Sequence, residues 1–137
     1  MGRVLAIDLG TKRTGIAVTD ILKITANPLE TIRTIDLDKF LKDYFQKEDV
    51  EAIVVGYPKS MDGTDTQMTK PAIKLKDKLS KAYSEKKVVL VDERFTSKMA
   101  MQSMIAMGSK KKDRKEKSGN LDKISAAIIL QTYLDQI

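Results

Sequence analysis

The stretch from Val4 to Val18, with the sequence VLAIDLGTKRTGIAV, constrains the fold more than any other part of the chain. Four apolar residues run directly into Asp8, Gly10 opens a turn, and a second apolar run follows Gly15. Short apolar runs joined by a Gly-flanked turn predict an antiparallel hairpin of buried strands. A carboxylate at the end of a buried strand is costly unless its charge is used. Asp8 is therefore the first candidate functional residue.

Three more strands are expected after this hairpin. The runs 52–56 and 88–91 are wholly apolar and predict buried strands, and a weaker strand lies within 27–33. An early antiparallel hairpin followed by βαβ units predicts an α/β fold. We expect one domain, residues 1–137, with a five-stranded mixed sheet whose first three strands are antiparallel and whose faces both carry helices.

Helical periodicity separates and follows these strands. Apolar residues at helical spacing predict a helix over 37–45 with Asp36 as its cap, and a second over 68–82 with Pro71 in its first turn. A Met-rich helix is expected from Thr96 to Gly108. Asn120 is a suitable cap for a last helix that extends to about Asp135.

Composition excludes several kinds of chemistry. The 137 residues contain no Cys and no His, so thiolate catalysis, disulfides and a histidine base are all excluded. No apolar stretch approaches the roughly 20 residues of a membrane span, and no signal-peptide pattern is present. We therefore expect a cytoplasmic protein without a membrane partner. Its chemistry must use carboxylates, hydroxyls, Lys, Arg or a bound hard cation.

The charge of the chain favours a polyanionic partner. The net charge is +6, and six of the ten residues from Ser109 to Ser118 are basic, against two acidic ones. Such a loop suits contacts with a phosphate backbone, although most charged loops are only solvated. The candidate phosphate-binding residues in this loop, beside the acidic strand ends and in the first turn are Lys12, Arg13, Arg94, Lys110, Lys111, Lys112 and Arg114.

Three acids are placed where they could converge. Asp8 and Glu93 end two strands, and Asp122 shares a helical stripe with Ala126 and Ile129, so it lies at the top of a face that should be buried. Hard cations such as Mg²⁺ or Mn²⁺ take carboxylate ligands, and two of them about 4 Å apart can hold both reacting oxygens of a phosphodiester. Singly, each acid could equally be a turn cap, a surface charge or a helix-dipole partner.

Four motifs in order resemble the YqgF (RuvX) family, which has an RNase H-like fold. They are residues 6–18, Val55-Gly56-Tyr57-Pro58 with 61–64, Asp92-Glu93-Arg94-Phe95-Thr96, and 122–131. The resemblance implies a divalent-metal nuclease whose catalytic and metal-binding acids are Asp8, Glu93 and Asp122. It also implies processing of the 5′ end of pre-16S ribosomal RNA in the bacterial cytoplasm, or cleavage of Holliday junctions.

Other interpretations remain open from the sequence. Asp62 or Asp92 could supply a further metal ligand. The partners could include the ribosome or its precursors, with the chain a monomer or a weak homodimer. A non-catalytic RNA-binding assembly factor is an alternative. An ATP-dependent sugar kinase or actin-like ATPase shares the Asp-Leu-Gly-Thr signal, but such proteins need two domains of this kind and a second phosphate loop.

Overall fold

The computed structural model describes residues 2–57, 64–92 and 120–136. Five strands, three α-helices and one short 3₁₀ helix make up this part of the chain. In chain order they are β1 (Arg3–Leu9), β2 (Arg13–Thr19), β3 (Ala26–Arg33), η1 (Thr34–Asp36), α1 (Leu37–Lys47), β4 (Val50–Tyr57), α2 (Thr69–Ala82), β5 (Lys87–Asp92) and α5 (Asn120–Gln136).

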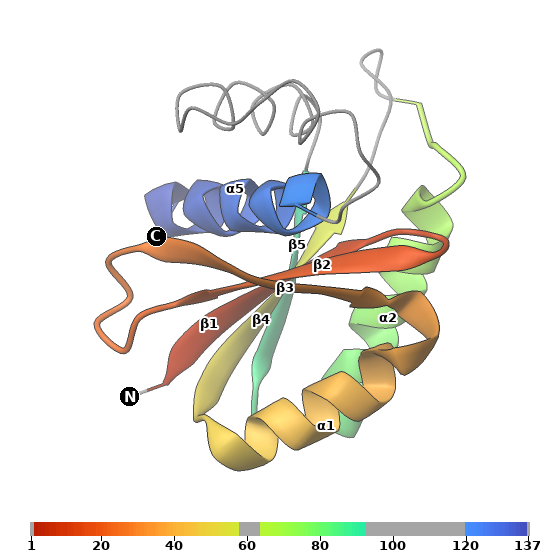
Figure 1. The fold of residues 1–137 in the computed structure, drawn as a ribbon. Coiled ribbons are helices and arrows are strands. Elements are labelled where there is room, and N and C mark those ends of the chain that lie inside the picture. The colour runs from red at the N-terminus through yellow and green to blue at the C-terminus, as the bar shows by residue number, and fades with distance from the viewer. Residues whose placement is uncertain (1, 58–63, 93–119, 137) are drawn as a thin grey trace.

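The strands form one mixed sheet in the order β3-β2-β1-β4-β5. β2 pairs antiparallel with both β1 and β3, whereas β4 pairs parallel with β1 and β5. Helix α5 covers one face of the sheet, and α1 and α2 cover the other (Figure 1). The predicted fold class is therefore confirmed, as are all five strands to within two residues at each end.

Alternation along the strands divides the core into two layers. Leu5 and Ile7 pack toward α1 and α2, whereas Val4 and Ala6 pack with the apolar residues of α5. Successive side chains of a strand point to opposite faces, so every residue of β1 can be placed on one face or the other. We call these faces the α5 face and the α1/α2 face.

The predictions for the ends of the helices are confirmed in part. Pro71 is the third residue of α2, in the first turn as predicted, where its missing N–H has no helical partner to lose. Asp36 occupies the N-cap position of α1 as predicted, but its side chain makes no capping bond; its Oδ2 accepts from Nε of Arg33 instead. The predicted helix from 96 to 108 lies outside the described residues.

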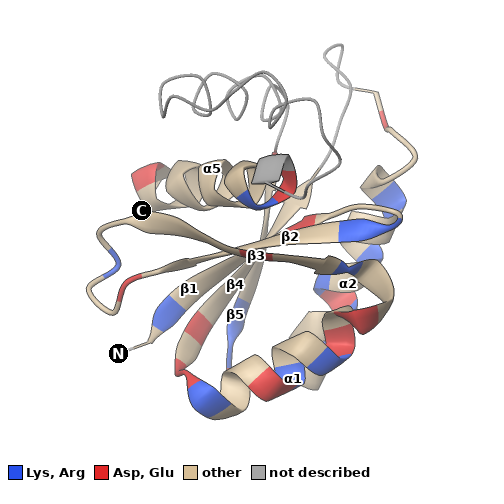
Figure 2. Cartoon of the chain, in the orientation of Figure 1, with Lys and Arg blue, Asp and Glu red and all other residues tan. Residues whose placement is uncertain are grey.

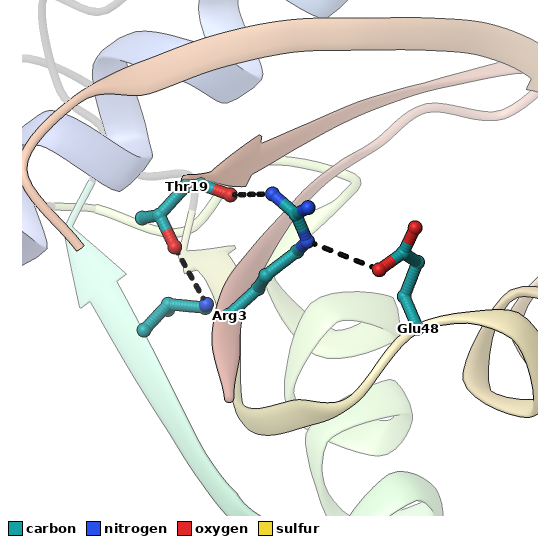
Figure 3. A network of polar contacts seen from close by, with 4 residues as sticks. Arg3, Thr19 and Glu48 are labelled. Atoms are coloured by element: carbon teal, nitrogen blue, oxygen red, sulfur yellow. Dashed lines mark hydrogen bonds and ion pairs between the residues drawn. The ribbon is translucent and has the colours of Figure 1, made fainter. Parts of the chain in front are cut away.

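The end of the sheet where β1 begins is held by a network around Arg3 (Figure 3). Arg3 donates through Nε to Glu48 at 3.3 Å and through Nη1 to the carbonyl of Thr19 at 2.9 Å. The buried Thr19 hydroxyl also accepts from the Val4 N–H at 2.9 Å. These bonds join β1, β2 and the α1–β4 turn, so the charge of Arg3 is used within the fold.

No helix in the described part of the chain has the length and apolarity that a membrane crossing requires.

Candidate active site

Asp8 lies near the carboxyl end of β1, at the edge of the sheet where β4 and β5 also end. These three strands run parallel, so their carboxyl ends meet at one edge, where ligands of such sheets bind. Because Val4 and Ala6 face α5, the pleat directs the half-buried Asp8 to the α5 face as well. The strand-end acid is thus presented beneath the last helix.

Gly15 brings the first turn of α5 to Asp8. It is the cross-strand partner of Asp8 on β2. A Cβ at Gly15 would collide with the backbone carbonyl of Asp122 and would lie 2.9 Å from the Lys123 nitrogen. Only glycine permits this approach, so the start of α5 is seated on the strand beside Asp8. Asp8 and Asp122 therefore lie on the same face of the sheet, and their joint role as ligands stays a prediction.

The rest of α5 is anchored by apolar packing. Its buried stripe belongs to the core layer of the α5 face, as the helical period predicts, and consists of Ala126, Ile129, Leu130 and Tyr133. Charged positions occur only toward the two ends of this helix, while its middle is uncharged (Figure 2). The packing of the helix middle therefore fixes where Asp122, in its first turn, must lie.

Arg13 is the charged neighbour of Asp122. The Nε of Arg13 lies 3.2 Å from Oδ2 of Asp122, and about a quarter of the Asp122 side chain is exposed. The same oxygen is buried and accepts no hydrogen bond of good geometry from any residue in the described part of the chain. The carboxylate is thus offset by a guanidinium that is near but poorly aligned, which leaves it available to a cation.

A cavity of about 550 Å³ opens beside this pair. Among the described residues, three basic side chains and one acidic one line it together with the β1–β2 turn; they belong to the set Gly10, Thr11, Lys12, Arg13, Arg33 and Asp122. The sequence predicted Lys12 and Arg13 here. It missed Arg33, which the β2–β3 register places opposite Arg13. Only a correct antiparallel register for the weak strand 27–33 could have revealed it.

Thr34 holds the turn of the cavity in place. Its N–H donates to the Lys12 carbonyl at 2.9 Å, and its hydroxyl donates to the Gly10 carbonyl at 2.7 Å. The same hydroxyl lies 2.8 Å from that of Thr14, which is fully buried. A Cβ at Gly10 would collide with the Arg13 carbonyl, so this turn also requires glycine. The cavity wall is therefore preorganised.

The other predicted site residues have mixed outcomes. Asp92 belongs to the α1/α2 face by strand alternation, because Val91 packs with α5, so its side chain is directed away from Asp8. The remaining predicted site residues lie outside the described residues: Glu93, Arg94, Asp62, Lys110, Lys111, Lys112 and Arg114. Within the described ranges, no three acidic side chains form a cluster that could hold a metal ion.

The donors that are present nevertheless suit a hard cation. Asp8 and Asp122 offer carboxylate oxygens from one face, and oxygen is the ligand that Mg²⁺ and Mn²⁺ prefer. The buried Asp122 oxygen without a well-aligned donor is the observation that favours a cation here. Glu93, outside the described residues, directly follows Asp92, the last residue of β5, in the sequence.

Comparisons with known proteins give a consistent result. A family model described as "RuvX: Holliday junction resolvase" matches residues 2–136. A protein of Christiangramia forsetii is 53% identical over 134 residues, which are 98% of each chain. One of Flavobacterium johnsoniae is 51% identical over 98% of this chain and 96% of its own. Both carry the name "Putative pre-16S rRNA nuclease".

Solved structures with low sequence identity share the fold. Fowlpox virus resolvase, in complex with Holliday junction DNA, superposes with a TM-score of 0.57 at 13% identity over 98% of this chain and 97% of its own. Thermus thermophilus RuvC with a junction substrate gives 0.54 at 16% identity over 99% and 96%. At this identity the likeness concerns the RNase H-like fold alone.

Proposed function

The chain belongs to the RuvX family of nucleases, and we propose that it hydrolyses phosphodiesters with the help of a divalent cation. Its substrate in this proposal is the 5′ end of pre-16S ribosomal RNA. The names of relatives about half identical over nearly the whole chain support the RNA substrate. The observation that carries the proposal is the close approach of the α5 start to Gly15 of β2, the cross-strand partner of Asp8, beside a cavity that three basic side chains of the described residues line. Such a substrate places the protein in the cytoplasm, with ribosome precursors as partners.

Asp8, Asp122 and Glu93 are the proposed metal ligands and catalytic acids. A bound Mg²⁺ or Mn²⁺ would acidify a water and stabilise charge on the reacting phosphate, which a protein without histidine needs. Asp8 is supported by its place at the end of β1, and Asp122 by its contact with Gly15. Glu93 is supported by its position directly after β5.

Basic side chains hold the substrate in this proposal. Arg13 offsets the charge of Asp122 at 3.2 Å, and together with Lys12 it lines the cavity where a phosphate would lie. The turn that carries them is fixed by Thr34, so little ordering is needed when a phosphate binds. Arg94, Lys110, Lys111, Lys112 and Arg114 are proposed to contact the backbone farther along.

Cleavage of Holliday junctions is the second candidate function. The family description names it, and the fold is shared with two junction resolvases. Contacts with phosphates do not distinguish RNA from DNA, so the cavity suits either backbone. A substrate comparison must therefore decide between them.

The decisive experiment is a cleavage assay with Asp8→Asn. Wild-type protein is incubated with Mg²⁺ or Mn²⁺ and either a pre-16S 5′ leader RNA or a four-way DNA junction. We expect the leader to be cut and the variant to be at least about 100-fold slower, because one metal ligand and its charge are lost. Thermal unfolding and nucleic-acid binding of the variant should stay near wild type.

Asp77→Asn is the matched control, since it removes one carboxylate from α2 on the opposite face of the sheet. It should cut at the wild-type rate. Full activity of Asp8→Asn would make the assignment of Asp8 wrong. Junction cleavage without leader cleavage would favour the second function. Leader binding unaffected by EDTA, with no cleavage of either substrate, would indicate a non-catalytic assembly factor.

A further inference from the structure

Arg33 is a cation beside the candidate active site that the proposed mechanism leaves unused. It is the last residue of β3, the edge strand of the sheet, and it lines the cavity of about 550 Å³ with Arg13, Lys12 and Asp122. The β2–β3 register makes Arg13 and Arg33 direct cross-strand partners. Two guanidinium groups therefore share one rim of the cavity.

Like charges placed directly opposite each other destabilise a sheet, so this pair needs an explanation. Each arginine carries a carboxylate on its Nε: Asp122 lies 3.2 Å from Arg13, and Asp36 lies 3.0 Å from Arg33. The two carboxylates offset part of the repulsion. They come from different elements, α5 and η1, and hold the two side chains from either side of the pair.

The Arg33–Asp36 contact also orients the guanidinium. It uses Nε, and a guanidinium has four more N–H donors on its two terminal nitrogens, the group that binds phosphate in a two-pronged manner. Almost three quarters of the Arg33 side chain is exposed, so these donors are accessible to a ligand. An exposed ion pair of this kind adds little stability. Asp36 thus contributes more to the direction of Arg33 than to the fold.

The position of Arg33 relative to the β1–β2 turn is fixed. Its neighbour Thr34 bonds to the carbonyls of Gly10 and Lys12, on the turn that lines the same cavity. On the strand side, the register with Arg13 fixes the backbone again. The backbones of Arg33, Arg13 and Lys12 are therefore held in fixed positions along one wall of the cavity.

The charge of the surface changes sign at Arg33. This residue also borders a second hollow of about 330 Å³, between β3 and α1. Apart from Arg33 itself, the charged side chains that line it among the described residues are three acidic ones and one basic one: Glu30, Asp36, Asp43 and Lys39. A polyanion is favoured on the side of the 550 Å³ cavity and disfavoured beyond Arg33.

We propose that Arg33, directed by Asp36, binds a second backbone phosphate next to the one at the catalytic acids, so that the substrate strand crosses β2 toward β3 and leaves the surface at Arg33. The ligand is a phosphodiester of RNA or DNA. The inference deepens the proposed function and rests on it. Arg33 would contact the phosphate backbone and not the bases, so loss of this contact should weaken binding of all nucleotide sequences to the same extent.

The test measures the salt dependence of binding by fluorescence anisotropy. All proteins carry Asp8→Asn so that the probe is not cut, and the probes are a labelled pre-16S 5′ leader RNA and a labelled four-way DNA junction. We expect Arg33→Gln to weaken binding by about three- to tenfold and to lower the slope of log K against log salt by about 0.7 to 0.9, one phosphate contact. Arg33→Lys should restore the slope, because it keeps the charge.

Lys39→Gln is the matched control: it removes an exposed cation from the acidic hollow on the other side of Arg33. Its slope and affinity should equal those of the parent. An unchanged slope for Arg33→Gln, or an equal loss for Lys39→Gln, would overturn the inference while leaving the proposed function intact. Failure of the parent Asp8→Asn protein to bind either probe would remove the proposed function, and the inference with it. A loss with only one probe identifies the nucleic acid that reaches Arg33.

Discussion

The two ends of the central sheet use the same residue types in opposite ways. At one end, Arg3 donates to Glu48 and to the Thr19 carbonyl and so ties β1, β2 and the α1–β4 turn together. At the other end, Arg13 offsets Asp122 and lines a cavity of about 550 Å³ with Lys12 and Arg33. An arginine whose donors meet protein acceptors contributes to stability, whereas an arginine that lines an open cavity can meet a ligand.

The first end is also where the β2–β3 turn is fixed by charge. Asp20 accepts from the backbone N–H groups of Ile24 and Thr25, and Lys23 donates to Glu51 at 2.6 Å. Lys23 adopts a positive φ of 60°, which the surrounding bonds hold in place. This end of the sheet can therefore be altered to probe stability, and the other end to probe substrate binding.

The largest expected effect on stability and cleavage is that of Gly15→Ala, at the end of the sheet that carries the candidate active site. The added Cβ would collide with the backbone of Asp122, so α5 must move away from β2. Overpacking of this kind costs about 3 kcal/mol in unfolding free energy, measured by urea titration. Displacement of Asp122 should also reduce cleavage by at least about tenfold, because ligand position governs metal-assisted hydrolysis.

Lys74→Ala, an exposed substitution on α2, serves as its control and should change stability by less than about 0.5 kcal/mol. A Gly15→Ala protein with full stability and full cleavage would contradict the seating of α5 on Gly15. A stable variant without cleavage would instead indicate that only the site geometry was lost.

Intermediate effects are expected from two matched substitutions, one arginine at each end of the sheet, and these compare the two ends directly. Arg3→Gln should lower the unfolding free energy by about 1 kcal/mol and leave nucleic-acid affinity unchanged, since it loses one ion pair and one bond to a carbonyl. Arg13→Gln should weaken binding of the leader RNA about three- to tenfold through a lost phosphate contact. Urea unfolding and anisotropy measure the two quantities. Equal effects of the two variants on binding would show that the ends do not differ as described.

The smallest expected effect is on the stability of the fold at acidic pH. Backbone donation, chiefly from the Thr25 N–H, lowers the pKa of Asp20, and the hydrogen bond from Lys23 lowers the pKa of Glu51. A carboxyl whose pKa is lower in the folded state stabilises the fold above its unfolded pKa of roughly 4, and this stabilisation is lost as the pH falls through the folded value.

Melting temperatures between about pH 5 and pH 3 test this prediction. The wild type should lose slightly more stability on acidification than the double variant Asp20→Asn, Glu51→Gln, because both groups are exposed and their contributions are small. Parallel curves for the two proteins would refute the assignment. Substrate binding at neutral pH should be the same for both.

Local patterns predicted most of the fold because they depend on neighbouring residues. The apolar runs identified four of the five strands, with 27–33 expected as a weaker one, and the stripe through Ala126 and Ile129 placed Asp122 on the side of α5 that packs on the sheet. Asp36 holds the predicted N-cap position but makes no capping bond: the sequence shows an acid before a helix but does not show that Arg33, on the preceding strand, donates to its carboxylate. The role of Glu93 stays a prediction.

Local sequence patterns specify which segments become strands and helices, and they place acids at the end of β1 and in the first turn of the last helix. Those features follow from periods of two and 3.6 residues along one segment. The contact of Gly15 with the start of α5, and the position of Arg33 opposite Arg13, are seen in the three-dimensional structure alone. Such contacts depend on register and packing between segments distant in the chain, where a shift of one residue would move every side chain to the other face.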